Sequence, residues 1–208
     1  MFLVDTSREL FSDDFLNSQS STYFLYSKDC VDSWKKSNRI EIPGDFSASL
    51  YFLAWSLFSK QLVEFYPKIS LAHPESYALD YLKENFGIDT KNNTFIPKGG
   101  VKYPLEPFDV ASAPDAALVI AAIAVNSGVQ VEFKNEEILR YKESDRLAAI
   151  RHFYTLPKEL DCCSDHRLAM AGAVLQLSTP LKLYGRECVS KSFPDFFVQW
   201  ERLLELSA

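Results

Sequence analysis

Three times along the chain, an aspartate opens a long apolar stretch that carries almost no charge. The stretches cover about residues 45–57, 115–125 and 165–177. An aspartate at a helix start accepts hydrogen bonds from backbone N–H groups that the helix leaves unpaired, and it suits the positive end of the helix dipole. Three such starts predict three buried helices, one in each copy of a repeated unit.

Each predicted buried helix is followed by a short strand with alternating apolar and polar residues, and then by an amphipathic helix. A strand is also expected before each aspartate, and its pattern is weakest before Asp165. This order is typical of an α/β fold assembled from βαβ units, with the amphipathic helices on the outside. The predicted strands are 61–65, 130–133 and 181–184, and the predicted outer helices are 73–85, 142–153 and 193–206.

The units differ in how they end. The first unit adds a hairpin, with strands at 88–90 and 94–96 on either side of a polar turn at 91–93. The second unit has only residues 155–163 before the third aspartate, which is too little chain for a hairpin and a strand together. One unit is therefore predicted to be trimmed.

The first part of the chain does not follow the repeat. Residues 1–40 are expected to form a separate leading segment, either a linker or a remnant. The repeat itself predicts a single domain over residues 41–208.

Composition permits a globular core and limits the possible partners. Of the 208 residues, 47% are hydrophobic, which excludes a largely disordered chain. The net charge of −6 argues against a general nucleic-acid binder, although a local cationic pocket stays compatible with it. The charged N-terminus is unlike a signal peptide, no apolar run predicts a membrane span, and the four cysteines have no metal-site spacing. We therefore expect a cytoplasmic protein with reduced thiols, no membrane association and no metal.

Lys142 and Arg146 lie at the start of a predicted amphipathic helix, four residues apart, with Glu143 beside them. A solvated helix start with local ion pairs explains them without any function. Two cations in a first turn nevertheless oppose the helix dipole unless an anion compensates. The cluster is therefore also compatible with an anion site.

His166 and Arg167 follow Asp165 in the first turn of a predicted buried helix, where anions are favoured. The helix dipole should lower the imidazole pKa, which suits a neutral proton donor or acceptor. The alternative is a capped helix in which His166 binds backbone and Arg167 pairs with Asp165.

Lys191 and Asp115 can also be explained either by local structure or by a binding site. Ser192 and Asp195, with Pro194 between them, form a helix-start signature that needs no functional explanation, whereas Lys191 lies outside it and can reach a bound phosphate. Asp115 is either a cap or a carboxylate held in a pocket.

Together these strings resemble the C-terminal half of the EPSP synthase (3-phosphoshikimate 1-carboxyvinyltransferase) family. They occur in the family's order over about residues 40–205. The strings that contain Lys142 and Asp165 are together the most specific. The matching strings are Gly44–Ser49 with Tyr51–Ala54, Pro114–Ala117, Tyr141–Leu147, Asp165–Ala171 and Lys191–Phe197.

The resemblance implies a fold and a reaction. The fold would be one domain of an inside-out barrel, in which βαβαββ units surround buried helices. The reaction would transfer the enolpyruvyl group of phosphoenolpyruvate to the 5-hydroxyl of shikimate 3-phosphate, without metal or organic cofactor.

The resemblance also implies roles for particular residues. Catalytic roles fall on Asp115, as base and ligand of the shikimate hydroxyls, on Glu143, in proton transfer at the enol carbon, and on His166 and Lys191 beside them. Substrate binding falls on Lys142, Arg146 and Arg167, and on Asp45, which we expect to act as a cap and positioning residue.

The motifs of the family's N-terminal half do not occur in this sequence. The resemblance therefore implies that the chain provides only half of the active site and that the N-terminal half is its partner. The alternative is a non-catalytic anion-binding or interaction domain derived from the enzyme. RNA 3′-phosphate cyclases and nucleotide-sugar enolpyruvyl transferases share the related fold, but the string from Lys142 to Arg146 argues against both.

Overall fold

The computed structural model describes residues 2–5, 44–66, 68–70, 73–91 and 94–207. The rest of the predicted leading segment and of the polar turn at 91–93 lies outside these residues. In chain order the elements are β1 (Phe2–Asp5), α2 (Phe46–Ser59), β2 (Val63–Tyr66), α3 (Tyr77–Phe86), β3 (Ile88–Lys91), β4 (Thr94–Pro97), β5 (Phe108–Asp109), α4 (Ala117–Asn126), β6 (Phe133–Lys134), η2 (Glu136–Tyr141), α5 (Arg146–Phe153), β7 (Glu159–Asp161), α6 (His166–Leu175), β8 (Lys182–Tyr184), η3 (Arg186–Lys191) and α7 (Phe196–Ser207).

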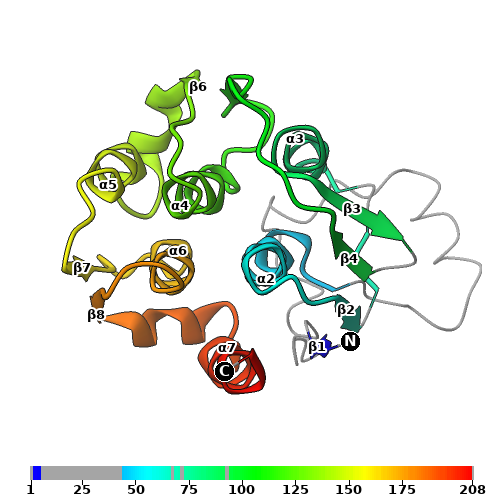
Figure 1. Cartoon of the computed structure of the whole chain (residues 1–208). Coiled ribbons are helices and arrows are strands. Elements are labelled where there is room, and N and C mark those ends of the chain that lie inside the picture. Colours follow the sequence, from blue (N-terminus) through cyan, green and yellow to red (C-terminus); the bar gives the residue numbers. More distant parts are fainter. Residues whose placement is uncertain (1, 6–43, 67, 71–72, 92–93, 208) are drawn as a thin grey trace, which may run out of the picture.

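The three apolar stretches form helices α2, α4 and α6, which pack against one another at the centre of the molecule (Figure 1). Every residue of α2 from Phe46 to Ser56 is buried, as is every residue of α4 from Ala117 to Ala124. A helix that is apolar on all sides is stable only when other elements surround it. The predicted buried helices are confirmed.

Helices α3, α5 and α7 lie outside this centre (Figure 1). Each buries one face, and α7 does so through Phe196, Trp200 and Leu203, which recur at helical spacing. Phe196 and Trp200 reach the central helix α2, where their ring centroids lie 5.2 and 6.0 Å from that of Phe52. Aromatic burial of this kind fixes α7 against the core.

The strands form three small sheets at the periphery (Figure 1). One sheet has the order β1-β2-β4-β3, in which the hairpin β3–β4 is antiparallel and β1 pairs in parallel with β2. The other two are parallel pairs, β5–β6 and β7–β8, whose strands flank α4 and α6 in sequence. The hairpin is as predicted, whereas the pairing of β1 was not predicted.

The connection between α5 and β7 is short. Helix α5 ends at Phe153 and β7 begins at Glu159, and no strand occurs between them. This connection overlaps residues 155–163, which were predicted from the sequence to be too few for a hairpin and a strand together. Among the described residues, no helix has both the length and the apolar character needed to cross a bilayer.

Three predicted helix starts were wrong. Helix α3 begins at Tyr77 rather than at His73. Helix α5 begins at Arg146 rather than at Lys142, because the Asp145 side chain accepts the Ala148 N–H at 2.9 Å and caps the helix there. Helix α7 begins at Phe196, and Ser192, which was expected to cap it, instead ends η3.

The helix end at Gly87 provides a test of the fold. Gly87 has φ +65°, and a Cβ there would lie 2.5 Å from the backbone carbonyl oxygen of Gly99. Gly128 has a similar φ of +70° but open space around it. We expect Gly87→Ala to lower the free energy of unfolding by about 2–4 kcal/mol and Gly128→Ala by about 1 kcal/mol, measured by urea unfolding. Equal losses would show that the close approach to Gly99 does not contribute.

Candidate active site

The N-terminal ends of α4, α5 and α6 meet in one place. Asp165 caps α6, and its Oδ1 accepts the backbone N–H groups of Arg167 at 2.9 Å and Leu168 at 3.4 Å. Arg146 is the first residue of α5, and Asp115 lies two residues before α4. Helix N-termini carry partial positive charge, so their meeting point favours anions.

A buried ion-pair network joins these three ends. Arg146 binds Asp165 through Nε at 2.7 Å and Nη2 at 3.1 Å, and its Nη1 lies 2.9 Å from Asp115 Oδ1. The Ser144 hydroxyl donates to the second oxygen of Asp165 at 2.9 Å. The side chains of Arg146 and Asp165 are only 2% and 0% exposed. Such burial is tolerated because each charge has a well-placed partner.

Three cations surround Asp115. Besides Arg146, Lys142 Nζ lies 3.3 Å from its Oδ1, and Arg167 Nη2 lies 3.1 Å from its Oδ2. Burial alone would raise the pKa of Asp115, but Arg167, Lys142 and Arg146 together hold it below its ordinary value. Asp115 does not cap α4, whose N-cap residue is Ala116. The interpretation of Asp115 as a cap is therefore wrong, and its carboxylate is held by three cations instead.

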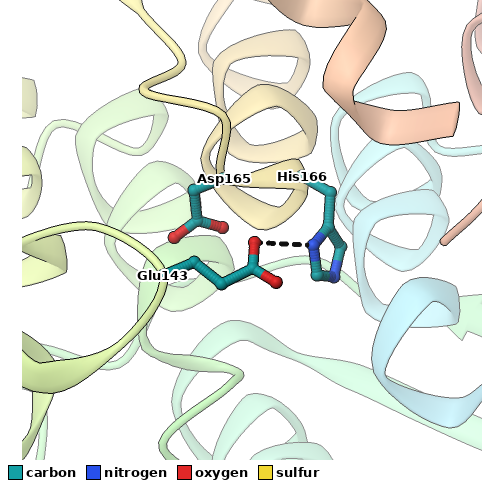
Figure 2. A group of neighbouring side chains, drawn as sticks. All are labelled: Glu143, Asp165 and His166. Atoms are coloured by element: carbon teal, nitrogen blue, oxygen red, sulfur yellow. Dashed lines mark hydrogen bonds and ion pairs between the residues drawn. The ribbon is translucent and has the colours of Figure 1, made fainter. Parts of the chain in front are cut away.

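Glu143, His166 and Lys191 form a second group beside the first. Figure 2 shows the Glu143 carboxylate turned toward the His166 ring, and its Oε2 lies 3.0 Å from His166 Nδ1. The same oxygen lies 3.5 Å from Lys191 Nζ. Burial and the charge of Arg167 lower the His166 pKa despite the neighbouring Glu143. A neutral imidazole at pH 7 is therefore favoured, as the sequence predicted.

Glu143, Asp165 and His166 also have the ligand types of a metal site, with ligand atoms within 4.8 Å of one another (Figure 2). The oxygens of Asp165, however, already accept hydrogen bonds from Arg146, Ser144 and the start of α6. A cation bound here would also face the guanidinium groups of Arg146 and Arg167. The donor set fits an ion-pair network better than a metal centre.

Seven of the eight site residues expected from sequence thus fall into these two groups. The eighth, Asp45, caps α2 as expected, accepting the Ala48 N–H at 3.0 Å, and lies in neither group. Their roles in binding and catalysis stay predictions. The first group contains Asp115, Lys142, Arg146 and Arg167, and the second contains Glu143, His166 and Lys191.

Sequence reasoning missed residues that support these groups. The Tyr51 hydroxyl donates to the Arg167 carbonyl at 3.3 Å, and Tyr51 belongs to one of the recognised strings, which could have indicated it. Glu75 accepts the backbone N–H of Asp115 at 3.1 Å. Glu75 had no signal in the sequence, because it lies outside every string and was assigned to the predicted helix 73–85.

Comparison with known proteins identifies the family of these motifs. The family model described as EPSP synthase (3-phosphoshikimate 1-carboxyvinyltransferase) matches residues 30–154 and 153–200. Proteins named 3-phosphoshikimate 1-carboxyvinyltransferase are similar to the chain. That of Haemophilus influenzae is 28% identical over 82% of this chain and 45% of its own length, and that of Shewanella pealeana is 27% identical over 96% of this chain and 52% of its own length.

A solved structure of EPSP synthase from Acinetobacter baumannii has a similar fold. It superposes with a TM-score of 0.64 at 19% identity and covers 79% of this chain and 46% of its own. The chain therefore spans about half the length of the relatives it matches. This partial coverage fits a C-terminal half.

The buried pair of Arg146 and Asp165 can be tested by unfolding. Asp165→Asn removes the fully buried charge partner of the Arg146 guanidinium and leaves it, among the described residues, with Asp115 alone, so we expect a loss of about 3–5 kcal/mol at pH 7, measured by urea unfolding. Burial raises the Asp165 pKa, but Arg146 and Ser144 outweigh it and lower the pKa below its unfolded value. The loss should therefore be full above about pH 4 and shrink as the pH falls through the folded value.

Asp145→Asn is the matched control, because Asp145 also caps a helix but lies at the surface. Asparagine caps about as well as aspartate, so we expect a loss below about 1 kcal/mol. Similar losses for the two variants would contradict a special role for the buried pair.

Proposed function

Because the chain belongs to the EPSP synthase family, we propose that it provides the C-terminal half of a site that transfers the enolpyruvyl group of phosphoenolpyruvate to shikimate 3-phosphate. The observation that carries the proposal is the meeting of three helix starts around Asp115, with cations from separate motifs placed on it. The N-terminal half of the enzyme would supply the remaining contacts. A cytoplasmic location and action without a cofactor are parts of the same proposal.

The proposal extends to the architecture. The domain over residues 41–208 would correspond to one inside-out barrel domain of βαβαββ units, with one unit trimmed. The parallel pairs β5–β6 and β7–β8, each interrupted in sequence by a central helix, support it. So does the short connection between α5 and β7.

Asp115 is proposed to bind the hydroxyls of shikimate 3-phosphate and to accept the proton of the attacking 5-hydroxyl. The lowered pKa keeps Asp115 ionised at neutral pH, so its carboxylate can accept a proton, but it also makes Asp115 a weaker base than an ordinary aspartate. Lys142 would lie on the shikimate side of Asp115. Proton removal lets the hydroxyl oxygen attack the phosphate-bearing carbon of phosphoenolpyruvate while the methylene carbon takes up a proton. The resulting tetrahedral intermediate then releases phosphate as the methyl carbon gives up a proton and the double bond forms again.

Glu143 is proposed to transfer the proton at the methylene carbon of the enol, giving it in the addition step and taking one back when phosphate leaves. His166 contacts it at 3.0 Å and Lys191 at 3.5 Å, so both can orient it and respond to its change of charge. A neutral His166 can accept a hydrogen bond at one ring nitrogen and donate one at the other. This makes it suitable for orienting either Glu143 or the departing phosphate.

The cations would bind the carboxylate and phosphate of phosphoenolpyruvate. Arg167 and Lys142 contact Asp115, so a substrate anion would have to replace or share that partner. Arg146 has two further bonds to Asp165, so it would bind a substrate anion without leaving Asp165. Fixed cations of this kind stabilise the charge that develops on the leaving phosphate.

The test is reconstitution. We expect phosphate release from the two substrates when this chain is mixed with a separately produced N-terminal half, such as that of the Haemophilus influenzae relative. Asp115→Asn should lower the rate about 100-fold or more, because it removes the base.

Asp109→Asn is the matched control, since Asp109 is an aspartate of β5 that contacts Asn135 and Ser112 at the surface. Its rate should stay within about twofold of the wild type. The proposal is contradicted by the absence of release with every N-terminal half, or by equal rates for the two variants.

A second function is favoured by one observation. Lys142, Arg146, Arg167 and Lys191 are held in place by contacts within this chain alone, which fits a non-catalytic anion-binding domain. We expect this chain alone to bind phosphoenolpyruvate in a calorimeter, and Arg167→Ala to weaken binding about tenfold or more. Arg186→Ala removes a surface arginine paired with Glu201 and should leave affinity unchanged. No binding by the wild type would contradict this second function.

A further inference from the structure

Glu75 contacts the backbone of Asp115, and the reaction proposed above assigns it no role. It lies just before α3, where its backbone N–H donates to His73 Nδ1 at 3.1 Å. Its Oε1 accepts the backbone N–H of Asp115 at 3.1 Å. Its Oε2 is buried and has no hydrogen-bond partner among the described residues. A carboxylate with one buried, unpaired oxygen is a costly way to satisfy a single N–H group.

A purely structural role would not require the charge. A glutamine at position 75 would have the same length and would also offer an oxygen to the Asp115 N–H. What glutamate adds is a negative charge close to a second carboxylate. Such pairs stabilise folding poorly, because like charges at a partly buried site oppose each other's ionisation.

We propose that Glu75 is a positioning residue for Asp115, which fixes the Asp115 backbone through Oε1 and through its negative charge makes Asp115 a stronger proton acceptor. The first part of this inference rests on the geometry alone. The second rests on the proposed function, in which Asp115 is the base.

The electrostatics of the surroundings support this inference. Burial raises the Glu75 pKa, and the charge of Asp115 raises it further, while the Asp115 N–H, Arg167 and Lys142 oppose the rise without cancelling it. Interaction between two charges is mutual, so ionised Glu75 raises the pKa of Asp115 in turn. His73, the other titratable group of this segment, has its pKa lowered by burial and by Arg167 and stays neutral at pH 7.

The raised pKa has a consequence for stability. A carboxyl group whose pKa is higher in the folded than in the unfolded state stabilises folding below its unfolded value, about 4.3. That contribution is lost as the pH rises through the folded value. Ionised Glu75 therefore destabilises the folded chain at neutral pH relative to an uncharged residue, which is expected of a functional residue but not of a structural one.

The test begins with thermal unfolding of the whole chain at pH 4 and pH 7.5. We compare the difference in Tm between Glu75→Gln and the wild type at the two pH values. This difference should favour the variant by about 2 °C or more at pH 7.5 relative to pH 4. In an Asp115→Asn background the same comparison should give a smaller improvement, because the opposing charge is gone. Glu84→Gln, which alters an exposed glutamate of α3, should show no pH-dependent change.

A second measurement uses the chain reconstituted with an N-terminal half. Glu75→Gln should lower kcat about three- to tenfold, because a weaker base removes the hydroxyl proton less readily. Its KM for shikimate 3-phosphate should stay within about twofold, because the glutamine oxygen still fixes Asp115. Glu75→Ala should in addition raise KM, since it also removes the oxygen that accepts the Asp115 N–H.

The outcomes separate this inference from the proposed function. It is overturned if the improvement in Tm is absent, if it is equally large in the Asp115→Asn background, or if kcat is unchanged in Glu75→Gln. If even the wild type releases no phosphate, the proposed function fails, and the unfolding measurements still decide whether Glu75 and Asp115 are coupled.

Discussion

The buried guanidinium of Arg146 is the interaction on which the candidate site depends. It binds Asp165 through two nitrogens and Asp115 through a third, and so it joins the starts of α4, α5 and α6. Removing such charges from water costs several kcal/mol for each ion, and only complete pairing offsets that cost. Because a partly satisfied network of this kind is strongly unfavourable, the three helix starts cannot separate independently. The position of Asp115, and of the other cations placed on it, follows from this constraint.

The network also divides the cations by what they can do. Arg146 is only 2% exposed and is held by Asp165, whereas Lys142 and Arg167 reach Asp115 from more exposed positions. The resemblance alone assigned Arg146 and Arg167 to the same anion-binding role. In the structure Arg146 joins the helix starts through Asp165 and Asp115, whereas Lys142 and Arg167 pair with Asp115. Under the proposed function, Arg167 and Lys142 would exchange this partner for a substrate anion. Because Asp115 already holds both cations in place, such binding would cost little further side-chain freedom.

The sequence predicted the elements whose signal is periodic and local, and it was less informative where contacts between distant segments decide. The apolar stretches and the caps Asp45 and Asp165 were read correctly, because burial and capping leave a pattern within a few residues. The start of α5 was misplaced, since the charges at Lys142 suggested a first turn that Asp145 in fact begins later. The contacts around Asp115 come from residues separated by tens of positions. Family motifs indicated most of these residues, but not Glu75, which belongs to no motif.

Asp115 and Asp165 open their apolar stretches in the same way, yet their carboxylates are used differently. Asp165 uses both oxygens on its own helix start, Arg146 and Ser144, which leaves little capacity for a ligand. Asp115 leaves the cap position of α4 to Ala116, and its own backbone N–H is bound by Glu75. Its carboxylate is therefore paired with Lys142, Arg146 and Arg167 rather than with its own helix start. Among the residues that the structure describes, no side chain caps the start of α4, and the preceding Asp115 N–H is bound by a buried carboxylate with one unpaired oxygen. Such local departures from stability are typical of functional sites, which agrees with the role proposed for Asp115.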